Sequence, residues 1–106
     1  MLYHIVKQDY WDKFKVDFLY FSDNFDQEGF IHFSKESQVT GVLERYYKNE
    51  DNLILLSIDE SRLTSEIRFE NSTNGELFPH LYGGLNIDAI IQVFKGTASE
   101  LSFKFL

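Results

Sequence analysis

The chain has 106 residues, no cysteine, and 17 acidic residues against 10 basic ones, for a formal charge of −7. This length fits a single domain, 1–106, with one core. Without cysteine there is no disulfide, thiolate metal site or thiol nucleophile, and a reducing cytoplasm is the expected compartment. The acidic balance disfavours duplex nucleic acid, which is held chiefly by Lys and Arg on phosphates. No stretch approaches the roughly 20 apolar residues of a membrane span, and residues 1–7 do not resemble a signal peptide.

The first half of the chain predicts short strands around a loop. Strands are expected at Leu2–Val6, Phe18–Phe21 and Phe30–Phe33, because each is a short apolar or aromatic run. A first short helix is expected at Gln8–Lys15, and the polar stretch Ser22–Gly29 is expected to be a loop. The buried side of this helix is expected to hold Tyr10, Trp11 and Phe14.

The clearest helix is predicted over Lys35–Lys48. Apolar residues at positions 39, 42, 43, 46 and 47 recur at the spacing of one buried helical face. Ser34 stands where an N-cap is expected, and Glu36 in the first turn favours the helix dipole. Residues Asn49–Asn52 are expected to end the helix.

The second half predicts strands and no helix. Leu53–Ile58 is a continuous apolar run of the length of a buried central strand. Ile67–Glu70 alternates as a half-exposed strand does, and Leu101–Phe105 alternates as a last, edge strand. Ile87–Phe94 is a further apolar strand, and Asn71–Gly75 is expected to be a loop. Strands therefore outnumber the two helices, which predicts an α+β domain and not a doubly wound parallel sheet.

His32 and Ser34 stand two residues apart in a predicted strand, so both point to one face and Ile31 and Phe33 to the other. Such a pair can offer a general base beside a hydroxyl, or two hydrogen-bonding groups for a sugar or phosphate. The N-terminus of the helix that follows suits an anion. The alternative is a histidine bonded to the backbone and a Ser34 that acts only as the N-cap.

Two further segments carry polar side chains suited to a ligand. Phe78–Gly84 is predicted to be a rigid loop that displays His80 and Tyr82, because it combines a proline with two glycines. The alternative is a structural loop in which they only cap the core. Arg68 and Glu70 share a strand face: they either pair with cross-strand partners, or Arg68 clamps a phosphate or carboxylate.

The remaining polar groups give weaker signals. His4 shares its strand face with apolar neighbours, which is more typical of a core histidine than of a ligand. A zinc site of three histidines lacks HxH or HExxH spacing, so no metal is predicted. There is no GxGxxG, Walker or GxSxG sequence. The acidic stretch 17–28 is interpreted as a solvated loop, with a contact surface for a basic partner as the alternative.

Several of these segments, taken in order, resemble a known family. They are Tyr3–Ile5, Trp11, Glu28–Ser34 with Gln38, Ile67–Glu70 and Gly75–Gly83. Together they resemble the small bacterial domain of unknown function numbered 952, which genome annotation sometimes labels glutathione S-transferase-like. The resemblance extends from Leu2 to about Val93. The glutathione S-transferase label has no support, because 106 residues cannot hold a thioredoxin-like half and a helical domain.

The resemblance implies an ADP-ribosyltransferase-like fold, with two small, mostly antiparallel sheets around an NAD-binding cleft. By position, His4 matches the first-strand histidine that holds a ribose hydroxyl in transferases of the His–Tyr–Glu type. Their later glutamate corresponds to Glu70 or Glu76. The family's usual Gly-Pro after the His–Tyr segment is here Gly83-Gly84, which suggests a looser turn.

Two functions follow as expectations. The first is an enzyme that transfers or removes an ADP-ribosyl or phosphate-bearing group, with His4, His32 and Glu70 catalytic and Ser34, Arg68, His80 and Tyr82 binding the ligand. NAD is the possible cofactor. The second is a module that keeps the cleft without the chemistry and binds a nucleotide, a small anion or another protein. No oligomeric state is specified by the sequence.

Overall fold

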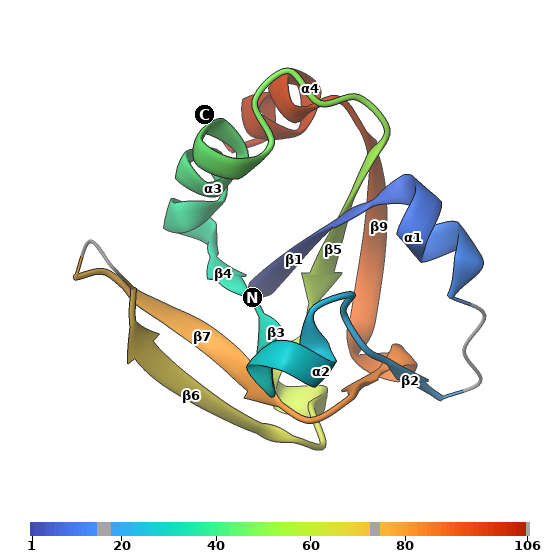
Figure 1. Ribbon diagram of the computed structural model, residues 1–106, viewed down its shortest axis with the longest axis vertical. Helices are drawn as coiled ribbons and strands as arrows, with labels where there is room; N and C mark the ends of the chain where they lie inside the picture. Colours follow the sequence, from blue (N-terminus) through green and yellow to red (C-terminus); the bar gives the residue numbers. More distant parts are fainter. Residues whose placement is uncertain (15–17, 73–74, 106) are drawn as a thin grey trace.

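A four-stranded antiparallel sheet is the centre of the fold in the computed structural model, which describes residues 1–14, 18–72 and 75–105 (Figure 1). Its strand order is β4-β1-β5-β9. The inner strands are β1 (Leu2–Lys7) and β5 (Leu53–Ile58), and every residue of β5 is buried, as the continuous apolar run predicts. The edge strands are β4 (Ser34–Lys35) and β9 (Ile90–Gly96).

Two smaller antiparallel sheets lie beside this central one. The three-stranded sheet has the order β3-β7-β6, from β3 (Ile31–His32), β7 (Leu77–Tyr82) and β6 (Glu66–Asn71). The other is a ribbon of β2 (Leu19–Tyr20) with β8 (Leu85–Asn86). The α+β prediction with antiparallel pairing is therefore confirmed, although the described residues form three sheets where two were expected.

Four α-helices occur in the described residues, where two were expected. Figure 1 shows α3 (Val39–Tyr46) and α4 (Ala98–Phe103) on one side of the molecule, away from α1 (Gln8–Lys13). The fourth, α2 (Phe25–Glu28), is a single turn. Three 3₁₀ turns lie at Glu36–Gln38, Glu60–Arg62 and Ile87–Ala89.

Strand alternation divides the core into two clusters on the two faces of the central sheet. Leu2 and Val6 of β1 face a cluster covered by α1, β2 and the three-stranded sheet. Tyr3 and Ile5 face the opposite cluster, covered by α3 and α4. Tyr20 is fully buried in the first cluster, and its ring contacts three aromatic side chains of the first helical segment, Tyr10, Trp11 and Phe14. The predicted side of that segment does pack on the core, but its three aromatic side chains are only partly buried; Lys15 lies outside the described residues.

Three predicted elements were wrong, each because a local pattern was misread. Ser22–Gly29 contains α2, which is too short to show a helical period and ends at Gly29 with a left-handed φ of 81°. Phe78–Gly84 is mostly strand β7, held between β3 and β6 despite its proline. Leu101–Phe105 belongs largely to α4, whose Thr97 and Glu100 form a capping box.

The start of the long helix also differs from the prediction. Ser34 is not an N-cap: it is a residue of β4 and pairs with Tyr3 of β1. The side chain of Gln38 instead stabilises the start of the helical segment, because its Oε1 accepts a hydrogen bond from the Lys35 main-chain N–H at 3.0 Å. Tyr46, predicted on the buried face, is 66% exposed.

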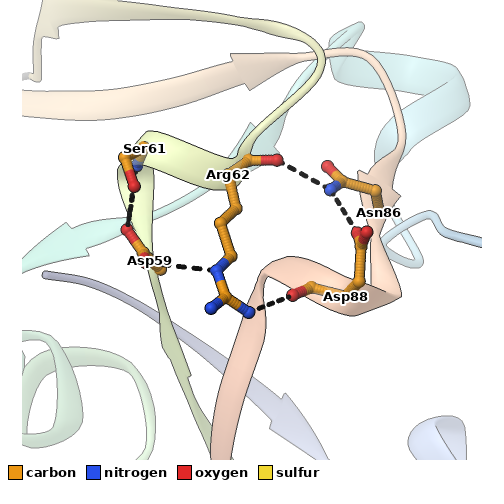
Figure 2. Close-up of polar contacts among 5 residues, drawn as sticks. All are labelled: Asp59, Ser61, Arg62, Asn86 and Asp88. Carbon is orange, nitrogen blue, oxygen red and sulfur yellow. Dashed lines mark hydrogen bonds and ion pairs between the residues drawn. The ribbon is translucent and has the colours of Figure 1, made fainter.

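A polar cluster fixes the turn that leads from β5 into β6. Figure 2 shows Asn86 between Arg62 and Asp88: its Nδ2 donates to the Arg62 carbonyl at 2.9 Å and to the Asp88 carboxylate at 2.6 Å. Its Oδ1 accepts from the Thr64 main-chain N–H at 3.2 Å. Asn86 is buried, so these bonds replace the water it loses on folding. The cluster thereby sets where β6 begins.

Candidate functional site

Three predicted site residues form a row across the three-stranded sheet. His32 of β3 is paired with His80 of β7, and His80 is paired with Arg68 of β6. Because directly paired residues lie on the same face, all three side chains project from one side of this sheet. The rings of His32 and His80 are 5.3 Å apart between centroids. The structure therefore brings together residues that are up to 48 positions apart in the sequence.

Glu70 binds both polar side chains of β7. Its Oε1 accepts from His80 Nδ1 at 2.8 Å and from the Tyr82 hydroxyl at 2.5 Å. These two hydrogen bonds, that from Tyr82 first, hold the pKa of the Glu70 carboxyl below its usual range. A carboxylate only accepts, so Nδ1 of His80 carries the proton and Nε2 is the acceptor in the neutral ring. Phe30 stacks on the His80 ring with centroids 4.0 Å apart.

Arg68 is exposed and already holds a carboxylate. Its Nε and Nη2 donate to the two oxygens of Glu66 at 3.1 and 3.2 Å, and this contact raises the Arg68 pKa. The guanidinium lies 4.4 Å from the centroid of the Tyr82 ring. Arg68 is thus oriented for a bidentate contact, but an anion that binds it must displace Glu66.

Glu76, the second candidate for the family's glutamate, lies in another environment. It accepts a hydrogen bond from Gln38 at 3.3 Å and pairs with Arg45 at 3.8 Å. Neither partner belongs to the row of His32, His80 and Arg68. Glu70, by contrast, contacts two other predicted site residues, His80 and Tyr82.

His4 is a core histidine with both ring nitrogens bonded, in agreement with the expectation for a histidine in an apolar strand. Its Nδ1 lies 2.8 Å from the main-chain oxygen of His32, and its Nε2 lies 2.9 Å from the Tyr20 hydroxyl. A carbonyl only accepts, so Nδ1 carries the proton and Tyr20 donates to Nε2. Burial lowers the His4 pKa to about 4, so the ring is neutral at pH 7.

A cavity of about 540 Å³ lies at the edge of β1. The short β4 pairs only with Leu2 and Tyr3, so in the described chain the same edge of β1 is unpaired from His4 onward. Figure 1 shows β1 running from β3 and β4 up to α1, with α2 below it and α3 on the left, beyond β4. Side chains from β1, β3, β4 and these helices complete the wall. The cavity therefore exists because the edge strand is only two residues long.

Two predicted site residues, Ser34 and His32, line the cavity, and within the described chain neither side chain is hydrogen-bonded to another side chain. Ser34 is only 3% exposed, and within the described chain its hydroxyl has no hydrogen-bond partner. The His32 ring, within the same described residues, makes no hydrogen bond to another side chain. Desolvation and, second, the neighbouring His80 lower the His32 pKa to about 4, so this ring too is neutral at pH 7. His32 and Ser34 therefore offer neutral donors and acceptors to a bound molecule.

The cavity and the polar sheet face meet at His32. His4 also lines the cavity, whereas His80, Arg68, Glu70 and Tyr82 lie on the sheet face beside it. Sequence reasoning missed most of the other wall residues. These residues come from separate segments and share no motif; they include Tyr20, Asp23, Glu28, Tyr47 and Glu50.

Neither a cluster of metal-binding side chains nor a membrane-spanning helix is found in the described part of the chain. No group of three or more His, Asp or Glu side chains is arranged to hold a metal ion there. For His4 the reason is direct, because both of its ring nitrogens are already bonded. None of the helices found in residues 1–14, 18–72 and 75–105 has the length and apolar character to cross a membrane.

The fold and its cavity define a small α+β domain of antiparallel sheets. The chain belongs to the family described as "Protein of unknown function (DUF952)", which it matches over residues 5–93. Its fold is similar to the crystal structure of protein CC0527 from Caulobacter crescentus, with 23% identity, a TM-score of 0.79, and coverage of 96% of this chain and 97% of that one. The solution NMR structure of CC0527 is also similar, with 28% identity, a TM-score of 0.73, and coverage of 88% and 81%. No curated protein matched the sequence.

Proposed function

We propose that this domain binds a phosphate-bearing small molecule of the nucleotide type, such as NAD or ADP-ribose, at the junction of the cavity and the polar sheet face. The observation that carries the proposal is the position of His32. It stands in the row with His80 and Arg68 and also lines a cavity of about 540 Å³, which is within the usual range for small-molecule sites. The absence of cysteine supports a cytoplasmic setting.

The charges of the two regions suggest how such a ligand lies. Arg68 is the cation of the sheet face, so the phosphate is expected there, with Tyr82 beside it. The sugar and base are expected in the cavity, where neutral His32 and Ser34 can bond hydroxyl groups. His4 acts by holding the main chain of His32 in place.

If the domain is also an enzyme, Glu70 is the group suited to charge stabilisation. An ADP-ribosyltransferase-like fold, which the family resemblance implies, would use such a carboxylate to stabilise the positive charge that develops on the ribose as nicotinamide leaves. Glu70 is ionised well below neutral pH and is half-exposed beside His80. The alternative is a module that binds the nucleotide without turnover. Nicotinamide release over hours in the presence of NAD supports the enzyme, and binding without release supports the module.

Binding is tested by titrating NAD and ADP-ribose into protein labelled at histidine and following the imidazole NMR signals. We expect the signals of His32 and His80 to shift most and that of buried His4 to shift less. No shift in any of the three at millimolar ligand would refute the proposal. Arg68→Ala should weaken ADP-ribose binding about tenfold, because a charge-assisted hydrogen bond contributes about 1.5–3 kcal/mol. Lys95→Ala, which removes a charge on β9 that is not part of the site, is the matched control.

A further inference from the structure

The wall of the cavity carries a net negative charge. Three carboxylates line it, from Asp23, Glu28 and Glu50, against one ammonium group, that of Lys7. Lys7 pairs with Glu50 at 3.5 Å. Within the described chain, no ion pair to Asp23 or Glu28 is formed. Since the two histidines of the wall are neutral at pH 7, the lining carries two net negative charges.

Aromatic faces stand next to these carboxylates. Four tyrosines line the cavity, and three of them are near an acidic wall residue. Burial is the first cause that raises the pKa of Tyr10, Tyr20 and Tyr47; the charge of Asp23 adds to it for Tyr10 and Tyr20, and that of Glu50 for Tyr47. Tyrosine rings attract cations through the negative potential of their faces. The guanidinium of Arg45 already lies 6.0 Å from the Tyr46 ring. Tyr10 and Tyr20 pack against each other and against Phe14. Half-buried Tyr47 is the lining tyrosine whose ring has no aromatic or cation contact among the described residues, so its face is the one available to a ligand.

The opposite part of the wall is polar and uncharged. The residue Ser34 is only 3% exposed, and within the described chain its hydroxyl has no partner, so this hydroxyl opens onto the cavity; the His32 ring, which makes no hydrogen bond to another side chain there, lines the same wall. In the described chain no fully buried side-chain polar atom lacks a partner, so solvent reaches this hydroxyl through the cavity, and a ligand hydroxyl can take the place of the water there. This feature is independent of the carboxylates, and it indicates a hydroxyl group in the molecule that fills the cavity.

We propose that the cavity binds a hydroxylated organic cation, with the positive charge between the Tyr47 face and the carboxylates of Asp23 and Glu50, and a hydroxyl on Ser34 and His32. This deepens the proposed function by naming the chemical class of the group that enters the cavity. It rests on that function only in using the same cavity, because it does not require a phosphate on the sheet face. A free anion is disfavoured inside the cavity by the two net negative charges.

Three small probes separate the two parts of this recognition. Choline carries both a quaternary ammonium and a hydroxyl, tetramethylammonium lacks the hydroxyl, and 3,3-dimethylbutan-1-ol is the uncharged isostere of choline. Each is titrated into ¹⁵N-labelled protein, and the amide signals of Ser34, Tyr47 and Glu50 are followed. We expect choline to bind about tenfold more tightly than the neutral alcohol, as one desolvated cation–π contact with carboxylate support provides.

Variants assign the two contacts to residues. Glu50→Gln, which also leaves Lys7 unpaired in the wall, should weaken choline and tetramethylammonium alike by about fivefold or more. Ser34→Ala should weaken choline and leave tetramethylammonium unchanged. Glu44→Gln, which changes an exposed residue of α3 that does not line the cavity, is the charge-matched control and should change neither. An unchanged ¹H–¹⁵N spectrum away from the cavity confirms that each variant is folded.

The outcomes are distinct. Equal affinity for choline and its neutral isostere, or no binding of choline at high millimolar concentration, overturns the inference. Nα-acetyl-lysine methylamide, which keeps its charged ε-ammonium group, is a further probe that imitates a lysine side chain of a protein. If it binds more tightly than choline, the site is assigned to a protein side chain and the assignment to a small molecule is overturned. Choline binding without any response to ADP-ribose would keep this inference and refute the proposed function. A response to ADP-ribose without one to choline would do the reverse.

Discussion

Nδ1 of His4 lies 2.8 Å from the main-chain oxygen of His32, so a buried histidine of the central sheet holds the strand that carries the histidine of the cavity. The bond requires a proton on Nδ1, and the Tyr20 hydroxyl on the other side requires a bare Nε2. The contact therefore depends on a neutral ring in one tautomer. It connects the stability of the fold to the position of His32.

The first prediction concerns acid stability. Burial lowers the pKa of His4 from its ordinary value of 6.5 to about 4 in the folded protein. Between these values the unfolded chain binds the proton and the folded chain does not, so the free energy of unfolding falls as the pH falls from 6.5 towards 4. The loss attributable to His4 is on the order of 3 kcal/mol. Urea denaturation at several pH values measures it.

A variant isolates the contribution of His4 from that of other groups. His4→Gln cannot titrate but keeps a donor and an acceptor, so it should lower stability at pH 7 and show a shallower dependence on pH between 6.5 and 5. His32, whose pKa is also about 4, should retain its own part of the slope. An identical slope in wild type and His4→Gln would contradict the prediction.

The second prediction concerns Asn86, the centre of the cluster in Figure 2. Asn86→Ala removes bonds to the main chain of Arg62 and Thr64 and leaves these groups without their buried partner. We expect the free energy of unfolding to fall by about 2–3 kcal/mol, as for a buried polar group left unsatisfied. Ser61→Ala, an exposed residue that only bonds Asp59, should cost less than half of this. Equal losses in the two variants would show that the cluster does not fix the turn.

The central part of the fold was predictable because its signals are local and strong. The apolar run of β5 and the spacing of Val39, Val42 and Leu43 each identify an element without reference to the rest of the chain. The errors arose where two local rules competed. For α4, the alternation of Leu101, Phe103 and Phe105 outweighed the capping sequence at Thr97, which the structure shows to be decisive.

The candidate site was predictable in part for a related reason. Alternation places His32 and Ser34 together, and likewise Arg68 and Glu70, because both relations are local. The register that sets His32 beside His80, and His80 beside Arg68, depends on pairing between distant strands. Pro79 and the two following glycines favoured a loop there. The cavity depends on the early end of β4, for which the sequence contains no signal.

The third prediction concerns the tautomer of His80. Glu70→Ala removes the acceptor that holds the proton on Nδ1, so neutral His80 should exchange between its two tautomers. The ¹⁵N chemical shifts of the ring report this directly. The effect on stability should be small, because Glu70 is half-exposed. Glu66→Ala, on the same strand and face, should leave the His80 tautomer unchanged, and a change there would mean that Glu70 is not the controlling contact.

The fourth prediction tests the helix that sequence patterning misassigned. The Thr97 side chain accepts from the Glu100 main-chain N–H at 3.1 Å, and the Glu100 Oε1 accepts from the Thr97 main-chain N–H at 2.9 Å. Thr97→Ala should lower the free energy of unfolding by about 1 kcal/mol, as the loss of an N-cap does, whereas exposed Ser99→Ala should be neutral or slightly stabilising. The cap matters beyond its own turn because α4 buries Leu101 against the central sheet, next to α3. Amide hydrogen exchange should therefore quicken in α4 of the variant before it does in β5. If Leu101–Phe105 were a strand, as its alternation predicts, removing the Thr97 hydroxyl would change neither measurement.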